Sequence, residues 1–181
     1  IGGKGNASAC TCSEEERWYV SVGAQGTACL NWATGKLMWR RQDLPCDHCR
    51  GAASSPILWE DLLILTFDGF DKQYLVALNK KTGDTVWKTD RNFDYGTDNG
   101  DVMKAYSTPK VADFGKRLEL ISPSAGATAA YDPRTGKELW RVKSMGMNAS
   151  CRPVVDGGIA FGATADNGRG VFAVKLGGDG A

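Results

Sequence analysis

The same eleven-residue pattern occurs three times in this chain, at 29–39, 77–87 and 130–140. In every copy an Asn or Asp stands three residues before a Thr, Gly follows that Thr, and Trp comes four residues after the Gly. An Asn or Asp side chain starts a turn by bonding to nearby backbone, and Gly supplies the positive φ that closes a short hairpin loop. Each copy therefore predicts two antiparallel strands joined by a tight turn, with the Trp on the face that is buried.

The copies recur at a spacing that is typical of a repeat architecture. Their Gly residues are 48 and then 53 residues apart, and periods of roughly 40–50 residues are typical of propeller blades. The positions that define the structural repeat are Gly35, Trp39, Gly83, Trp87, Gly136 and Trp140. We therefore predict an all-β chain of four-stranded blades. A β-sandwich is the main rival, but it does not explain a Trp repeated at one offset, and helical apolar spacing is not sustained in any window.

The strand signals divide the chain, as a single partial propeller domain over 1–181, into about four blades at 10–41, 54–90, 107–143 and 151–176. The last blade reaches a turn at 177–180 and lacks its fourth strand. An open array leaves an apolar face at each end. Three arrangements would cover these faces: closure of four blades into a small ring, which would bring Cys10 near Cys151; two copies in one twofold-symmetric ring; or the missing blades of a longer chain.

Charge and hydropathy exclude two classes of partner. The formal net charge is +1, so no nucleic-acid-binding footprint is visible. No run approaches the roughly 20 apolar residues of a membrane span. The chain starts without the charged head and apolar core of a signal peptide.

The pattern A-x-[DN]-x-x-T-G-x-x-x-W, with Cys29 in place of the first Ala in one copy, resembles the repeat of the pyrroloquinoline quinone (PQQ)-like β-propellers. That family includes quinoprotein alcohol dehydrogenases and the outer-membrane assembly lipoprotein BamB. The resemblance covers Cys10 to Leu176 and implies a ring of blades, often eight, of which this chain is about half. It also implies an extracytoplasmic protein, periplasmic or secreted. We expect the chain to be closer to BamB-like binding propellers than to the dehydrogenases.

Function is expected where irregular segments gather, not in the repeat. The segments that link one blade to the next share one face with the loops between the two middle strands, and they carry most of the irregular polar sequence. These link segments include Asn148, and the middle-strand loops include Asp166. A rigid scaffold with polar loops is typical of a binding face. The residues predicted to bind a ligand or partner there are Arg50, Asp68, Asp71, Lys104, Tyr106 and Arg152.

Two metal sites are alternatives within the same loops. Carboxylates at Asp94, Asp98 and Asp101, with a Gly that permits a bend, match the oxygen ligands that calcium prefers. Cys46 and Cys49 have the spacing of half a zinc site. Ordinary solvated loops are the competing interpretation of both.

Two function classes remain. The first is a non-catalytic scaffold that binds a protein or small ligand through one face. The second is a piece of a PQQ- and calcium-dependent dehydrogenase. In those enzymes an adjacent Cys-Cys pair covers the quinone, and this sequence has no such dipeptide. We therefore predict a binding scaffold without bound PQQ or other cofactor, calcium being the alternative.

Overall fold

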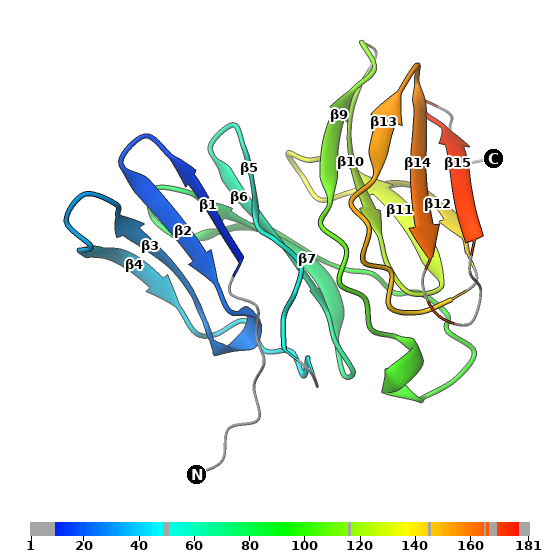
Figure 1. Ribbon diagram of the computed structural model, residues 1–181, viewed down its shortest axis with the longest axis horizontal. Coiled ribbons are helices and arrows are strands. Elements are labelled where there is room, and N and C mark those ends of the chain that lie inside the picture. Colours follow the sequence, from blue (N-terminus) through cyan, green and yellow to red (C-terminus); the bar gives the residue numbers. More distant parts are fainter. Residues whose placement is uncertain are drawn as a thin grey trace.

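The computed structural model describes residues 10–48, 51–115, 117–144, 146–164, 166 and 170–177, which form four antiparallel sheets (Figure 1). Within each sheet the strands lie in chain order. We call the sheets blades 1 to 4. Blade 1 contains β1 (Cys10–Glu14), β2 (Arg17–Ser21), β3 (Thr27–Asn31) and β4 (Leu37–Arg41). Blade 2 contains β5 (Ile57–Trp59), β6 (Leu62–Asp68), β7 (Gln73–Asn79) and β8 (Thr85–Asp90).

Within the described part of the chain, blade 4 has one strand fewer than the other blades. Blade 3 contains β9 (Lys110–Asp113), β10 (Leu118–Pro123), β11 (Ala127–Tyr131) and β12 (Glu138–Lys143). Blade 4 contains β13 (Val154–Asp156), β14 (Ile159–Thr164) and β15 (Gly170–Lys175). Two single-turn 3-10 helices, η1 (Gly23–Gln25) and η2 (Gly100–Val102), lie in loops. The predicted partial propeller of four-stranded blades, the last incomplete, is confirmed.

The three repeat hairpins share one set of turn interactions. In blade 2, the Gly83 N–H donates to the Asn79 carbonyl at 2.8 Å, and the Thr82 N–H donates to Asn79 Oδ1 at 3.2 Å. The corresponding bonds form at the Asn and Asp of the other two copies. Gly83 has a φ of +81°, which a residue with a Cβ adopts only at a cost. The predicted role of this Gly in the turn is confirmed.

The repeated Trp joins each blade to the turn of the next. Trp39 Nε1–H donates to the Lys80 carbonyl at 3.0 Å, and its ring packs so closely on Gly83 that a Cβ there would lie 2.8 Å away. Trp87 repeats this arrangement one blade later, against the Pro133 carbonyl and Gly136. The turn Gly is therefore required twice, for its backbone conformation and for the Trp ring of the preceding blade.

Three apolar clusters fill the spaces between neighbouring blades. The first joins blade 1 to blade 2 around Tyr19 and Trp39, the second joins blades 2 and 3 around Trp87, and the third joins blades 3 and 4 around Trp140. The third junction differs, because Trp140 Nε1–H donates to the fully buried Glu119 carboxylate at 2.7 Å.

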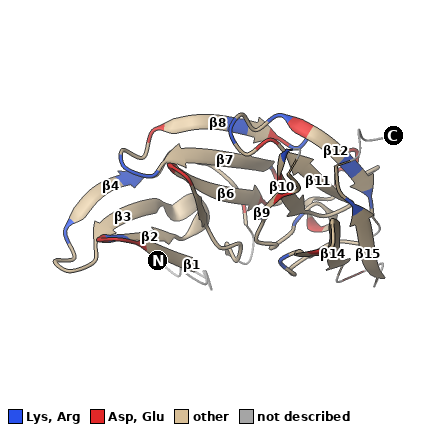
Figure 2. Cartoon of the chain, turned by 90° about the horizontal axis from the view of Figure 1, so that it is seen from above, with Lys and Arg blue, Asp and Glu red and all other residues tan. Residues whose placement is uncertain are grey.

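The four blades form an open arc. Blades 1 and 4 lie at opposite ends in two perpendicular views (Figures 1 and 2). In Figure 2, β4, β8 and β12 lie along the outer edge of the arc. Closure of these four blades into a ring is therefore not observed, and Cys10 and Cys151 are not joined by a disulfide. Among the described residues no helix is long and apolar enough to cross a membrane.

Candidate functional site

The segments that link the blades lie on one face of the arc, the lower side in Figure 1, and are joined to the blades by backbone hydrogen bonds. We call this surface the loop face: the described residues of links 42–56, 91–109 and 144–153, with the middle-strand loops 69–72 and 124–126. The Phe70 N–H donates to the Asp47 carbonyl at 2.7 Å, and the Ala105 N–H donates to the Asp68 carbonyl at 3.2 Å. These bonds tie the links to blade 2, so the loop face has a fixed backbone.

The second and third links are bonded to each other. The Tyr106 N–H donates to the Ala149 carbonyl at 2.7 Å, and the Asn148 N–H donates to the Lys104 carbonyl at 3.0 Å. Met147 and Asp166 exchange two backbone hydrogen bonds, which attach the third link to blade 4. Side chains from segments far apart in sequence are thereby brought to one place.

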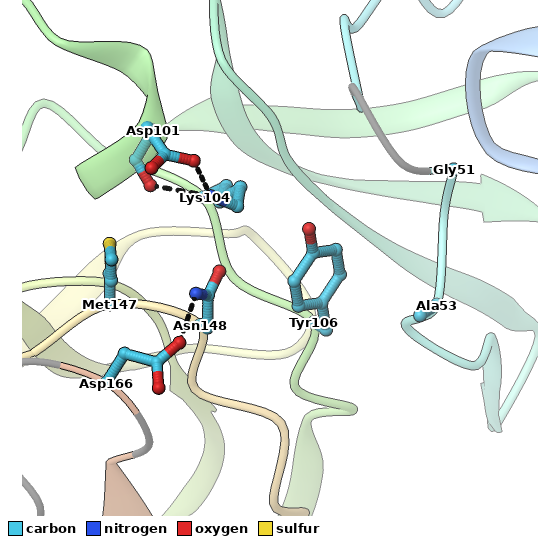
Figure 3. Close-up of a pocket in the computed structure, with 8 residues that line it drawn as sticks. All are labelled: Gly51, Ala53, Asp101, Lys104, Tyr106, Met147, Asn148 and Asp166. Atoms are coloured by element: carbon cyan, nitrogen blue, oxygen red, sulfur yellow. Dashed lines mark hydrogen bonds and ion pairs between the residues drawn. The ribbon is translucent and has the colours of Figure 1, made fainter.

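A pocket of about 390 Å³ opens at this junction (Figure 3). It is lined by Gly51, Ala53, Asp101, Lys104, Tyr106, Met147, Asn148 and Asp166. All three links therefore contribute to it. Two of the residues predicted to bind, Lys104 and Tyr106, are together in this pocket.

Lys104 lies in the pocket wall and is almost fully buried. Its ammonium contacts the Asp101 carboxylate, donates to the Asp101 carbonyl at 3.0 Å, and lies 5.3 Å from the centre of the Phe70 ring. A carboxylate, a carbonyl and an aromatic face together balance the buried charge. Lys104 is therefore held by the protein itself and offers little free positive charge to a ligand.

Asn148 and Asp166 form the opposite wall. Asn148 has a φ of +56°, a conformation that Asn tolerates better than most residues. Its Nδ2 donates to Asp166 Oδ2 at 2.7 Å, while its Oδ1 is buried without a hydrogen-bond partner among the described residues. Both residues were expected on this face, but neither was among the predicted binding residues. The only feature of the sequence that could have pointed to Asn148 is that Asn accepts a positive φ more readily than most residues.

Asp68, predicted to bind at the loop face, is instead fully buried. Arg91 Nε donates to Asp68 Oδ1 at 2.6 Å and Nη2 to Oδ2 at 2.8 Å, and both side chains have zero exposure. Burial raises the pKa of Asp68, and the guanidinium opposes that rise. The prediction of a ligand-binding role at Asp68 does not fit this geometry, because Asp68 is the last residue of β6 and its carboxylate is turned towards blade 3. Arg91 Nη2 also donates to Ser122 Oγ there.

Two other predicted binding residues, Asp71 and Arg152, do not line the pocket. Asp71 is exposed and accepts a bond from the Asp47 N–H at 2.7 Å. Arg152 is exposed next to the start of blade 4. Arg50 lies outside the described residues.

The structure does not gather the predicted calcium ligands. Asp94 Oδ1 accepts the Gly96 N–H at 2.9 Å, Asp98 is exposed, and Asp101 pairs with Lys104. Across the described part of the chain, no three His, Cys, Asp or Glu side chains are close enough together to hold a metal ion. The described residues therefore do not bring the three predicted carboxylates together around one ion.

The predicted zinc ligands are Cys46 and Cys49, of which Cys49 lies outside the described residues. Cys46 is buried, its Sγ lies 3.8 Å from His48 Nδ1, and burial raises the pKa of its thiol to about 12. Metal ions bind the thiolate, so this environment opposes ligation. Burial also lowers the pKa of His48.

Comparisons with known proteins agree with the fold. The family model described as outer membrane protein assembly factor BamB matches residues 4–177. The crystal structure of BamB from Moraxella catarrhalis superposes with a TM-score of 0.72 at 16% identity, over 94% of this chain and 49% of that one. A quinohemoprotein alcohol dehydrogenase from Pseudomonas putida HK5 gives a TM-score of 0.64 at 15% identity, over 97% and 33%.

One sequence relative is an enzyme subunit. Subunit 1 of methanol dehydrogenase [cytochrome c] from Methylobacterium organophilum is 35% identical over 81 residues, which is 41% of this chain and 12% of that protein. The chain thus spans about half of the BamB structure and about an eighth of this dehydrogenase subunit.

Proposed function

Because the chain belongs to the family of the outer membrane protein assembly factor BamB, we propose that it is a non-catalytic propeller scaffold that binds a protein partner or ligand through its loop face. The observation that carries this proposal is the pocket at which all three links meet. The second and third links are bonded to each other through their backbones, and the first link is bonded to blade 2, so the pocket is preformed, as binding sites usually are. The family description also supports an extracytoplasmic setting for the protein.

A binding screen with paired variants tests the use of this face. The change Asn148→Gly keeps the positive φ and removes only the side chain, and Lys104→Met removes the charge from the pocket wall. Lys81→Met makes the same chemical change in a repeat hairpin at the other end of blade 2. Compounds and candidate proteins are screened by thermal shift and calorimetry. A binder that is lost in the two pocket variants and kept in Lys81→Met supports the proposal, and binders indifferent to all three contradict it.

We also propose that the free end of blade 1 is covered by another blade that carries the repeat Trp. In blades 2 and 3 the turn Gly contacts the Trp of the preceding blade, but a Cβ at Gly35 would meet no heavy atom within 4 Å among the described residues. Trp18 and Met38 are also exposed at this end. Trp39, Trp87 and Trp140 are already packed at the junctions between blades 1 and 2, 2 and 3, and 3 and 4. The covering blade is therefore expected from outside the described strands, in a longer chain or a second copy.

Light scattering behind a sizing column separates these sources. A mass near twice 19.4 kDa that persists on dilution and is lost in Gly35→Val would indicate a second copy on this face. A monomer would indicate that the covering blade belongs to a longer chain and not to a second copy. A dimer that Gly35→Val leaves intact would refute the proposed use of the blade 1 turn.

A dehydrogenase segment is the second candidate, favoured by the 35% identity to the methanol dehydrogenase subunit. Its test is dye-linked alcohol oxidation after addition of PQQ and calcium. Turnover that requires both additions and is absent from a heat-unfolded sample would support this candidate against the scaffold.

A further inference from the structure

We infer that the turn of blade 1 docks a strand of different sequence from the four described blades, in which a Trp is followed two residues later by a hydrogen-bond donor such as Thr or Arg. This inference rests on the proposed covering of blade 1 and adds the chemistry of the covering strand. It starts from the two turns of the same kind that are already occupied within this chain.

The turn of blade 1 has the backbone of the occupied turns but is exposed. The Gly35 N–H donates to the Asn31 carbonyl at 2.8 Å, and the corresponding bonds in blades 2 and 3 have the same length. Gly35 has a φ of +68°, close to the values at the other two turn glycines. Gly83 and Gly136 are buried, whereas Gly35 is exposed and Trp32 beside it is 63% exposed. The blade 1 turn is therefore preformed and uncovered.

The turn of blade 2 is bound at two points by one strand of blade 1. Trp39 Nε1–H donates to the Lys80 carbonyl at 3.0 Å. Two residues further along β4, Arg41 Nη1 donates to the Gly83 carbonyl at 2.7 Å. Residues two apart in a strand point to the same face, so a single strand reaches both carbonyls of the turn.

The turn of blade 3 is bound in the same way by β8. Trp87 Nε1–H donates to the Pro133 carbonyl, and Thr89 Oγ1 donates to the Gly136 carbonyl at 2.8 Å. The second donor is thus a guanidinium in one junction and a hydroxyl in the other. The shared requirement is a donor two residues after the Trp and not a positive charge.

The corresponding acceptors in blade 1 are the carbonyls of Trp32 and Gly35. Trp32 follows the first residue of its turn as Lys80 does in blade 2, and Gly35 occupies the place of Gly83. A Cβ built at Gly35 would meet no described heavy atom within 4 Å. This open position is the one at which the indole ring packs in blades 2 and 3.

The third junction lacks the second donor and has a different geometry. Val142 stands two residues after Trp140 and cannot donate a side-chain hydrogen bond. Trp140 Nε1–H donates to the Glu119 carboxylate of its own blade at 2.7 Å. The Trp alone therefore does not define the docking arrangement.

A second copy of this chain does not supply a suitable strand from its described part. The two strands with both donors, which carry Trp39 and Trp87, are already packed against blades 2 and 3. The strand of Trp140 lacks the second donor, and the other Trp residues of the chain are not in a fourth strand. The docking strand is accordingly assigned to a partner of different sequence.

NMR titration with cyclised hairpin peptides tests the inference at the turn itself. The first peptide reproduces residues 74–90, and two others carry Thr89→Val or Trp87→Leu. We expect the first peptide to shift the Gly35 amide resonance and the Thr89→Val peptide to bind about fivefold more weakly, since one hydrogen bond is lost. The Trp87→Leu peptide should not shift this resonance. Gly35→Val in the protein should abolish binding, and Gly96→Val, at another exposed Gly with positive φ, should not.

The outcomes separate this inference from the proposed covering. Equal affinity of the first and Thr89→Val peptides, or no Gly35 shift with any peptide, overturns the inference. A dimer that Gly35→Val dissociates also overturns it, because a second copy would then cover blade 1, and the proposed covering would stand.

A second measurement examines the donor at an occupied junction. Thr89→Val should lower the midpoint of urea unfolding, because the Gly136 carbonyl loses its partner. Thr11→Val, the same change at an exposed position of β1, should leave the midpoint unchanged. Equal midpoints for the two variants contradict the role of the second donor.

Discussion

Replacing Asp68 with Asn should destabilise the fold more than any comparable change at the surface. The Asp68–Arg91 pair has two direct bonds of 2.6 and 2.8 Å and no solvent exposure on either side chain. The substitution keeps the shape and removes the charge, so the Arg91 guanidinium is left buried without its counter-ion. Removing one partner of a buried ion pair costs about 3–5 kcal/mol. Domains of this kind have about 5–15 kcal/mol of stability in total.

The matched control is Glu138→Gln. Glu138 also makes two bonds to an arginine, Arg141, at 2.6 and 2.7 Å, but that pair is partly exposed. Solvent screens it, and the expected cost is below about 1 kcal/mol. The two variants therefore differ in burial and not in the chemistry of the change.

Urea unfolding followed by Trp fluorescence measures both variants. A third protein, Asp68→Leu with Arg91→Met, replaces the pair by apolar side chains of similar size and should recover most of the stability lost in Asp68→Asn. This variant keeps the test decisive if Asp68→Asn does not fold. A cost at Asp68 equal to that at Glu138, or a double variant no better than the single one, would refute the reasoning.

The remaining predictions concern the repeat glycines and the thiols. Gly83→Ala should cost about 1–3 kcal/mol more than Gly35→Ala in urea unfolding, because both have positive φ but only Gly83 packs on the ring of Trp39; equal costs would argue against a packing role. In native protein near pH 8, a thiol reagent should label the exposed Cys151 well before the buried Cys46, with mass spectrometry identifying each site. Because burial raises the pKa of Cys46 from 9.0 to about 12, its stabilising contribution should be complete below pH 9 and lost as the pH rises towards 12; Cys46→Ala should flatten that part of the pH dependence of the thermal midpoint.

The repeat made the fold predictable because each of its residues has a local task. Asn79 and Gly83 form the turn by themselves, and Trp87 is placed by strand alternation from that turn. These interactions span few residues, so sequence spacing is enough to identify them. Sequence spacing could not predict that the Trp39 ring also packs on Gly83, because that contact joins two blades.

The binding residues were harder to predict, because residue type does not determine whether a side chain is free to contact a ligand. Asp68 and Asp166 are both carboxylates beside a middle-strand loop. Asp68 is neutralised by Arg91, which lies 23 residues further along the chain. Asp166 faces a pocket because the third link is bonded to it through Met147. The difference between them depends on long-range partners that no local pattern encodes.

The same argument explains why the pocket lies between the second and third links. The buried Asp68–Arg91 pair fixes the end of β6, and the Asp68 carbonyl accepts the N–H of Ala105, next to Lys104. The Lys104 carbonyl in turn accepts the N–H of Asn148. A charge buried inside the arc is thus connected through two backbone hydrogen bonds to residues that line the pocket. Loss of Asp68 should therefore weaken any ligand of the pocket, although Asp68 itself cannot touch it.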